Sequence, residues 1–441
     1  MKTKKRLIFL IAVWSCFLFI IGCKSDVEKT GANSEDEQKI QDEGLEIPID
    51  SRFVVSETAK ANTTLSGDST AKDPLSAFKF HGDLNNNAVY NSPSIRAPKD
   101  VKWEFQSNDL IVSSPAVVNG RAFFGSYDRH FYAVDIKDGS EVWKFQANSA
   151  ISSSPAVSEK LVYFSDVSGN IYALDVETGQ QKWLYETMEL FPAEIEQYDY
   201  FTSSPTIMED TVYIGGGDSS LYAIDKKTGE LKWKKKSDKE NAVIRTTPAI
   251  VEDVLFYADS VNNSGFVRAV DRNTGEELWN FNVYGLVQSS PVVVDGTVYI
   301  GTRDPRIYAI NANTGEYKWS FTFGGSWNLS TATVVEDTVY IGSSDSHRVY
   351  ILDAETGDEK WVLPTGDIHA IHSSPIYADG VLYFGTGANY EDDIGTLRAI
   401  DVNTHEELWR FQTEDKIISS PVIQNGVIYV TSFDGKLYAI E

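Results

Sequence analysis

The chain has 441 residues, and 64 aspartates and glutamates outnumber 39 lysines and arginines, which gives a formal net charge of −25. An acidic body of this kind repels phosphate backbones, so the composition argues against a nucleic-acid partner. The two cysteines, Cys16 and Cys23, both lie near the N-terminus, and the rest of the chain has no thiol for a disulfide, a thiolate metal site or a cysteine nucleophile.

Residues 1–22 have the composition of a secretory signal peptide. Basic residues come first, then an apolar run, then a small residue before Cys23. The sequence "IIGC" resembles a bacterial lipobox, which implies that Cys23 becomes the acylated first residue. An uncleaved membrane anchor is the alternative. Both interpretations predict an extracytoplasmic protein attached to a bacterial-type membrane, on its periplasmic side or at the cell surface.

Residues 23–77 are rich in Ser, Thr, Asn, Glu, Asp and Lys and have almost no aromatic residues. Such a segment has too little apolar surface to offset the entropy lost on ordering. We therefore predict a flexible acidic tether. A short apolar patch within it, "LEIPID…RFVV", could dock on the following domain, but we expect a solvated linker.

The remaining chain, residues 78–441, is built from a repeat of 40 to 50 residues. A period in this range is typical of propellers and solenoids, whose units cannot bury their apolar faces alone. One tryptophan marks each unit. These tryptophans are Trp103, Trp143, Trp183, Trp233, Trp279, Trp319, Trp361 and Trp409.

Each unit contains four short segments rich in β-branched and aromatic residues, separated by turn residues such as Asn-Gly and Asp-Gly. Four antiparallel strands in a meander make a propeller blade. The last copy, residues 419–441, provides only three strands, and "KDVKWEF" at 99–105 provides a fourth with nothing before it. We predict an all-β, eight-bladed propeller in which this N-terminal strand completes the last blade, because closure removes the exposed sheet edges.

Seven copies share the pattern A-x-D-x-x-T-G-x-x-x-W, as in "ALDVETGQQKW" at 173–183. This pattern resembles the tryptophan-docking motif of the PQQ-type β-propellers, and the lead-in "FKFHGDLNNNAVY" at 78–90 resembles the segment that precedes their first blade. The Thr-Gly pair provides the positive φ of a tight turn, and the tryptophan ring can lie between blades. In "AIDVNTHEELW", His405 replaces the glycine, and we expect a strained turn there.

Three insertions interrupt otherwise uniform turns, at 185–201, 258–265 and 385–395. Strand alternation places all three on one face, which is the candidate working face. The residue before each "SSP" should lie near the mouth of the central channel on that face. These residues are Val112, Ser152, Thr202, Arg245, Gln288, Leu329, His372 and Ile418.

Arg245, Gln288 and His372 form a polar sector of this predicted mouth. Further candidates within three residues of the same position are Tyr200, Trp327 and His369. Together these six residues are the candidate surface for a ligand or partner, and a water-filled funnel with scattered polar side chains is the alternative. The acidic loop of Glu391, Asp392 and Asp393 could hold Ca²⁺, but it lacks the spacing of a calcium loop, and we expect no metal.

The resemblance has functional implications of three kinds. A lipid-anchored eight-bladed propeller of this motif resembles the outer-membrane assembly lipoproteins of the BamB class, which implies a monomeric, non-catalytic scaffold for protein partners in the cell envelope. A cell-surface ligand- or glycan-binding propeller is an alternative. A PQQ-dependent dehydrogenase is a further one, but the adjacent cysteines of that family are absent, so we expect no catalytic residue and no cofactor.

Overall fold

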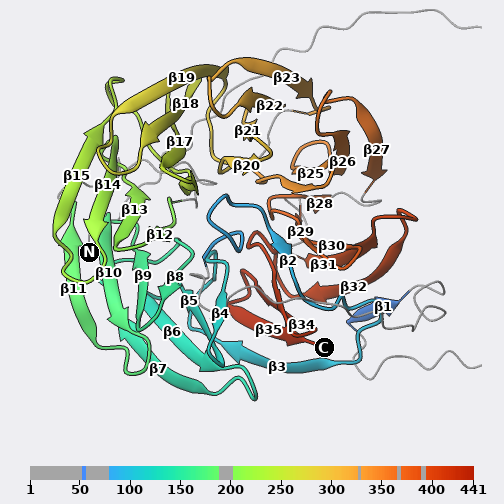
Figure 1. Ribbon diagram of the computed structural model, residues 1–441. Coiled ribbons are helices and arrows are strands. Elements are labelled where there is room, and N and C mark those ends of the chain that lie inside the picture. The colour runs from blue at the N-terminus through green and yellow to red at the C-terminus, as the bar shows by residue number, and fades with distance from the viewer. Residues whose placement is uncertain (1–51, 56–78, 188–201, 326–328, 365–368, 389–393) are drawn as a thin grey trace, which may run out of the picture. The chain divides into compact units, whose positions relative to one another are not determined.

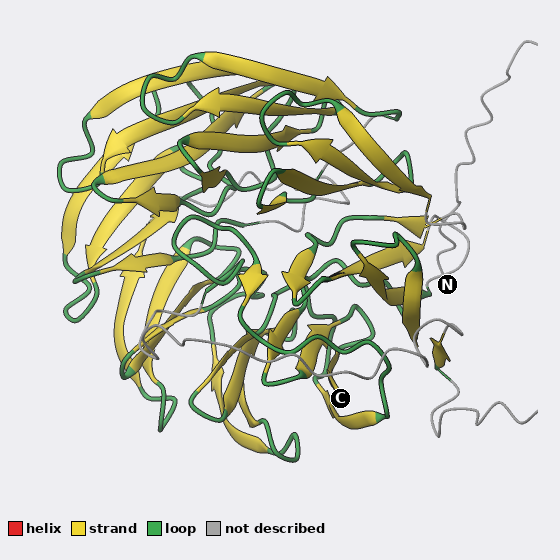
Figure 2. Cartoon of the chain, turned by 45° about the vertical axis from the view of Figure 1, so that its right-hand side comes forward, coloured by secondary structure: helices red, strands yellow, loops and turns green. Residues whose placement is uncertain are grey.

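The computed structural model describes residues 52–55, 79–187, 202–325, 329–364, 369–388 and 394–441. These residues form eight sheets around a common axis (Figure 1). In the described ranges all regular structure is strand (Figure 2). The eight-bladed propeller predicted from the sequence is thereby confirmed.

Each blade is an antiparallel meander, with its first strand nearest the central axis and its fourth strand at the outside. Blades one to four comprise β4 (Ala116–Val118), β5 (Arg121–Gly125), β6 (His130–Asp135) and β7 (Glu141–Gln146); β8 (Ala156–Ser158), β9 (Leu161–Ser165), β10 (Asn170–Asp175) and β11 (Gln181–Glu186); β12 (Thr206–Met208), β13 (Thr211–Gly215), β14 (Ser220–Asp225) and β15 (Leu231–Lys236); and β16 (Ala249–Val251), β17 (Val254–Val261), β18 (Ser264–Asp271) and β19 (Glu277–Tyr284).

Blades five to eight follow the same order. They comprise β20 (Val292–Val294), β21 (Thr297–Thr302), β22 (Arg306–Asn311) and β23 (Tyr317–Thr322); β24 (Thr333–Val335), β25 (Thr338–Ser343), β26 (Arg348–Asp353) and β27 (Glu359–Pro364); β29 (Ile376–Ala378), β30 (Val381–Ala388), β31 (Gly395–Asp401) and β32 (Glu407–Thr413); and β33 (Val422–Gln424), β34 (Val427–Thr431), β35 (Lys436–Ile440) and β3 (Val101–Gln106). Blade seven also pairs with β1 (Phe53–Val55), β2 (Val89–Tyr90) and β28 (His369–Ala370).

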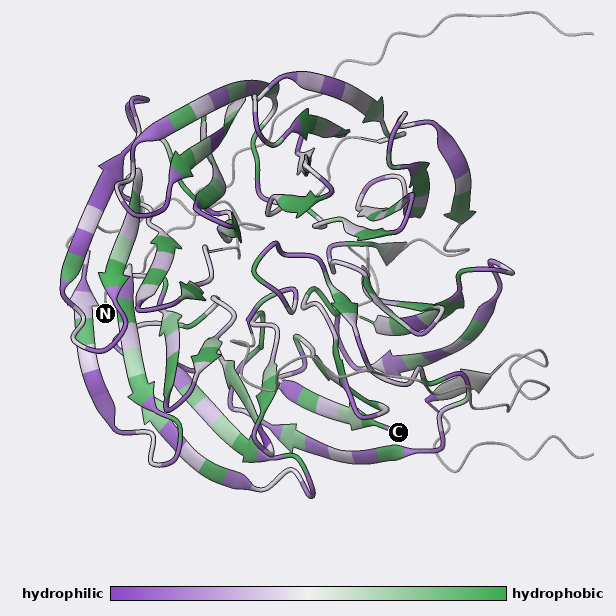
Figure 3. Cartoon of the chain, in the orientation of Figure 1, coloured by the Kyte–Doolittle hydropathy of each residue, from purple (hydrophilic) through white to green (hydrophobic). Residues whose placement is uncertain are grey.

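The two middle strands of each blade are apolar because neighbouring blades cover both of their faces. In blade one, β5 and β6 are buried over most of their length, whereas the outermost strand, β7, alternates between exposed and partly buried residues. Figure 3 shows this as hydrophobic colour inside the ring and alternating colour along the outer strands. The core is therefore a series of layers between blades.

The ring closes where the sequence predicted. β3 pairs antiparallel with β35, in a register that sets Trp103 opposite Ala439 and Gln106 opposite Lys436. The first strand of the repeat region thus completes the blade whose other strands end the chain. In Figure 1 the C-terminus lies beside β3.

The tryptophans dock between blades as the motif predicted. In six blades the indole Nε1 donates to a carbonyl of the next blade over 2.9–3.0 Å, and the ring covers the turn glycine of that blade so closely that an added Cβ would lie 2.5–2.9 Å from it. These pairs are Trp103–Gly139, Trp143–Gly179, Trp183–Gly229, Trp233–Gly275, Trp279–Gly315 and Trp319–Gly357. Trp409 faces the seam and instead donates to the Ile95 carbonyl at 2.7 Å.

In blades four and seven, segments that were predicted to be long loops are part of extended strands. Residues 258–265, expected as a loop, extend β17 and β18 to eight residues each and turn at 262–263. In blade seven, residues 385–388 likewise belong to β30, and β31 begins at Gly395. In blade four every added residue of β17 pairs with a residue of β18, whereas in blade seven Gly387 and Ala388 at the end of β30 pair with β28.

The predicted tether is also corrected at one point. Residues 53–55, assigned to the solvated linker, form β1 on the outer edge of blade seven, where Phe53 is opposite Phe411 and Val55 is opposite Trp409. The preceding Arg52 lies over the rings of Phe411 and Tyr438. The apolar patch docks because β32 offers a free sheet edge. The signal peptide and Cys23 lie outside the described residues.

Candidate functional site: the central channel

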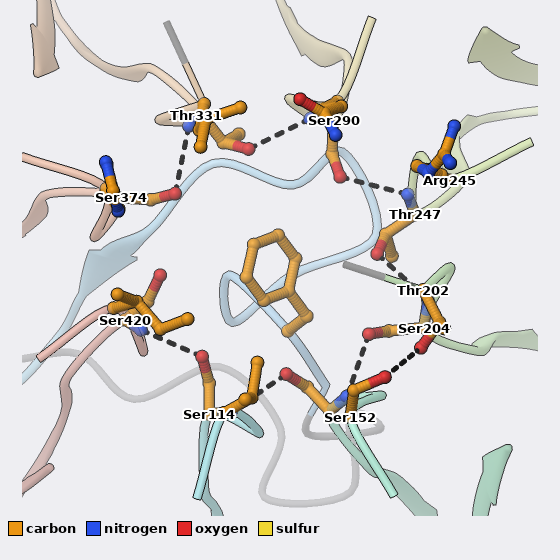
Figure 4. A pocket seen from close by; sticks show the side chains of 17 residues that line it. Ser114, Ser152, Thr202, Ser204, Arg245, Thr247, Ser290, Thr331, Ser374 and Ser420 are labelled. Atoms are coloured by element: carbon orange, nitrogen blue, oxygen red, sulfur yellow. Dashed lines mark hydrogen bonds between the residues drawn. The ribbon is translucent and has the colours of Figure 1, made fainter. Parts of the chain in front are cut away.

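A ring of hydroxyl side chains links the innermost strands of the blades. Seven backbone N–H groups, from Ser420 round to Thr331, each donate to the hydroxyl at the corresponding position of the next blade, over 2.8–3.2 Å. The ring residues are Ser114, Ser154, Ser204, Thr247, Ser290, Thr331, Ser374 and Ser420 (Figure 4). The serine or threonine at this position of each repeat therefore links neighbouring blades at the wall of the channel.

The structure places all eight residues that precede "SSP", or its equivalent, around one pocket together with this ring. Arg245, Gln288 and His372 are therefore brought to the same pocket. Space for water-sized molecules in it amounts to about 40 Å³, enough for about three waters at roughly 10–15 Å³ each. The Arg245 side chain extends away from the centre of the ring (Figure 4).

Two of the residues at the channel mouth, Arg245 and His372, lie close in sequence to residues that pair with the extended hairpins. Val243, two residues before Arg245, exchanges backbone hydrogen bonds with Ser260 in the added part of β17. Ala370, two residues before His372, pairs with Gly387 in the added part of β30. The hairpins of blades four and seven thus brace the chain that carries the two basic side chains of the rim.

The lead-in segment, 79–90, enters the channel, which the sequence analysis did not predict. Phe80 lines the same pocket as the rim residues, and Figure 1 shows the segment running into the centre of the ring before β2. His81 is 2% exposed. Its Nδ1 lies 3.1 Å from the Asn86 carbonyl, and its Nε2 lies 3.4 Å from the Ser420 hydroxyl. The funnel is consequently filled in part by the chain itself.

Asparagine side chains attach this segment to the inner edges of the blades. Asn85 exchanges hydrogen bonds with Val293 of β20, and Asn87 does so with Val334 of β24 through its side-chain amide. Asn86 is fully buried and donates to the carbonyls of Thr247 and Pro291. With further backbone bonds to Ile250 and Tyr377, the lead-in joins blades four to seven. The run "NNN" at 85–87 was the sequence signal for this docking, because asparagine amides can pair with the free backbone N–H and C=O groups of a strand edge.

Burial keeps the imidazoles of the channel neutral at pH 7. Desolvation lowers the pKa of His81 to about 3, and the positive charge of nearby Lys79 adds to this effect. Desolvation, followed by the charge of Lys416, lowers the pKa of His372 to about 4. Lys79, which donates to Asn86 Oδ1, has its pKa lowered by burial to about 7. The channel thus disfavours added positive charge.

Several candidates cannot be placed. Tyr200, Trp327 and the acidic loop Glu391–Asp393 lie outside the described residues, and of His369 only the backbone, in β28, is described. In the part of the chain that the structure describes, no group of three His, Cys, Asp or Glu side chains is arranged to hold a metal ion. Nor does that part contain a helix long and apolar enough to cross a membrane.

A family model described as "Outer membrane protein assembly factor BamB" matches residues 96–263 and 263–390, which together make up more than half of the chain. The chain belongs to the BamB family. The matched ranges contain most of the docking tryptophans and the Arg245–Gln288 part of the channel mouth.

The individual proteins that match the chain have low sequence identity to it. BamB of Salmonella typhimurium is 26% identical over 219 residues, covering 44% of this chain and 53% of that protein. The serine/threonine-protein kinase AfsK of Streptomyces griseus is 26% identical over 173 residues, covering 37% of this chain and 21% of the kinase. The chain thus matches about half or less of these relatives. A europium-containing methanol dehydrogenase has the same fold, with a TM-score of 0.70, 14% identity and coverage of 84% of this chain and 98% of that one.

Proposed function

We propose that the protein is a non-catalytic, lipid-anchored scaffold of the cell envelope that binds protein partners and acts, like BamB, in the assembly of outer membrane proteins. The match of the BamB family model over 96–263 and 263–390 is the observation that carries this proposal. Eight rigid blades present long outer strands and turns to solvent, a surface suited to protein contacts. The anchor is Cys23, and the working molecule is a monomer.

The channel supports a scaffold better than an enzyme. Its pocket holds Phe80 and about 40 Å³ of space for water-sized molecules. Two observations favour a scaffold over a PQQ-dependent dehydrogenase: Phe80 lines the channel pocket, and the chain has no adjacent cysteines. The methanol dehydrogenase likeness, at 14% identity, concerns the fold alone.

Affinity purification of the tagged full-length protein from native membranes tests this function. We expect components of a β-barrel assembly machinery to co-purify. A Cys23→Ala variant should shift from the membrane to the soluble envelope fraction while the propeller keeps its melting temperature. Absence of every envelope partner from the purified sample contradicts the scaffold. Dye-linked alcohol oxidation after adding PQQ and Ca²⁺ contradicts the non-catalytic assignment.

A second candidate function is ligand binding at the channel mouth, favoured by the presence of Arg245, Gln288 and His372 in the lining of one pocket. A ligand that enters there should raise the melting temperature of the protein, and Arg245→Ala and His372→Ala should abolish that increase. Screening soluble glycans and small carboxylates by thermal shift provides the measurement. Shifts that survive both substitutions exclude this site.

A further inference from the structure

The outer edges of blades four and seven are equivalent, but within the described residues only the edge of blade seven is covered. β19 and β32 share the sequence Glu-Leu-Trp-x-Phe, and both follow an extended hairpin. Their registers on the preceding strands also match: Asn280 is opposite Arg268, as Arg410 is opposite Arg398. Because the two edges have the same geometry, what binds one indicates what can bind the other.

On blade seven the occupant is visible. β1 runs antiparallel along β32, and the backbone N–H of Gln412 donates to the Arg52 carbonyl at 3.0 Å. Gln412 lies three residues after the docking tryptophan. The residue three positions after Trp279 is Asn282, so its N–H also faces away from β18, toward the open edge.

The composition of β19 also sets it apart. Every other outer strand contains a lysine or an arginine, residues that protect sheet edges from unwanted pairing. β19 contains neither and, at eight residues, is the longest outer strand within the described ranges. Leu278 is 54% exposed and Tyr284 is 59% exposed, whereas Leu408 on blade seven is 3% exposed. A long, apolar, unprotected edge is suited to strand addition.

We propose that the outer edge of β19 is a docking site for an extended segment of a partner protein, which adds to blade four as a fifth strand, antiparallel to β19. The segment resembles β1 in chemistry: short, β-branched and aromatic, and without proline. Main-chain hydrogen bonds at Asn280 and Asn282 hold it, and Leu278 and Tyr284 contact its side chains. This inference rests on the proposed scaffold function and specifies where and how that scaffold binds.

A synthetic peptide of residues 49–57, "IDSRFVVSE", is the probe, added to the intact protein. Hydrogen exchange at the Asn282 amide should slow at least tenfold at millimolar peptide, because that N–H becomes paired. The same peptide with Val54→Pro should have no effect. Absence of protection with the unmodified peptide overturns the proposal.

Two variants give matched tests. Asn282→Pro removes the outward N–H at an edge position where proline is tolerated, and it should weaken peptide binding at least tenfold. Lys236→Pro makes the same change three residues after Trp233 on blade three and should leave binding unchanged. The double variant Asn280→Lys, Asn282→Lys copies the lysines of β15 at equivalent positions and should also weaken binding. Binding unaffected by either β19 variant overturns the proposal.

The scaffold function and this site can fail separately. If envelope partners still co-purify with Asn282→Pro, the scaffold stands and the edge of β19 is not the docking site. If the free protein forms dimers that the double lysine variant dissolves, the occupant is a second copy of the chain, which contradicts the assignment to a partner.

Discussion

His405 stacks on Trp361, with ring centroids 4.2 Å apart and planes inclined by 13°. Six other blades place a glycine under the docking tryptophan, with φ between +69° and +78°. His405 keeps the same backbone region at φ +62°. In the other six blades the indole packs against a glycine, which has no side chain. At this interface Trp361 packs against the imidazole ring of His405 instead.

Substitutions at His405 should separate these two effects. His405→Gly relieves a left-handed conformation that costs about 1–2 kcal/mol but loses a ring pair worth about 0.5–1.5 kcal/mol. The free energy of unfolding should therefore change by no more than about 1.5 kcal/mol. His405→Ala loses the stacking without the relief and should be less stable than His405→Gly. Denaturant unfolding measures both.

Gly357→Ala is the control for this pair. An added Cβ at Gly357 would lie 2.5 Å from the Trp319 ring, at φ +78°. It should destabilise the protein by at least about 2 kcal/mol, since overpacking and backbone strain both contribute. If Gly357→Ala is neutral, the tryptophans do not need the glycine contact.

Asn86 should contribute strongly to the stability of the fold, although it lies in a connecting segment. It is fully buried and its amide donates to the Thr247 and Pro291 carbonyls. Asn86→Asp keeps the shape but replaces both donors with an oxygen, leaving two buried carbonyls unpaired at about 1–3 kcal/mol each. We expect a loss of roughly 2–6 kcal/mol in the free energy of unfolding, measured against the exposed control Asn91→Asp, which should be near neutral.

Stability should decrease in mild acid because of the buried imidazoles. The pKa of His81 is lowered to about 3 in the folded state, below its unfolded value of about 6.5. The unfolded chain therefore binds the proton more readily, so stability is full above pH 6.5 and is lost as the pH falls toward 3. His372, with a pKa of about 4, acts in the same direction.

His81→Asn should flatten this decline between pH 6.5 and 3, whatever its effect at neutral pH. The measurement is the slope of the unfolding free energy against pH. An unchanged slope in His81→Asn would show that other groups cause the acid sensitivity.

Closure of the ring can be tested by truncation. A chain that starts at residue 107 lacks β3 and exposes the edge of β35, whereas a chain that starts at residue 79 retains both β3 and the lead-in. The shorter chain should lose cooperative melting and self-associate, because an open apolar edge pairs with other chains. Equal melting temperatures for the two chains would contradict closure through β3.

The repeat was predictable because every copy has the same kinds of residues at the same positions. Hydrophobic strands, Asp-x-x-Thr-Gly turns and tryptophans recur at one spacing, so the blade number, the docking contacts and the split last blade could all be inferred. The positions of Arg245, Gln288 and His372 around the channel followed from the same register.

The extended hairpins had a signal that is visible in retrospect. In four blades a tyrosine of the third strand donates to an aspartate of the preceding turn, as Tyr132 does to Asp128 and Tyr438 to Asp434. In blades four and seven arginine replaces this tyrosine, and each arginine pairs with a glutamate on the outer strand, in Arg268–Glu277 and Arg398–Glu407. Arginine in place of this tyrosine marks the two blades whose hairpins continue.

The docking of β1 and of the lead-in could not be predicted in this way. Local sequence shows that "RFVV" can form a strand and that "NNN" can satisfy backbone groups. Which edge receives each of them depends on distant surfaces, 208 residues away for Asn85 and Val293. Such pairings are properties of the assembled ring.

The lead-in and β3 are synthesised before any of the surfaces that receive them. Blades four to seven must exist before Asn85, Asn86 and Asn87 have partners, and β3 pairs with the last strand of the chain. The lead-in therefore stays unpaired until blades four to seven have been synthesised, and β3 stays unpaired until β35 has been synthesised. Pairing over nearly the whole length slows folding, so the newly made chain passes through a period in which its first strand needs protection from other strands in the same compartment.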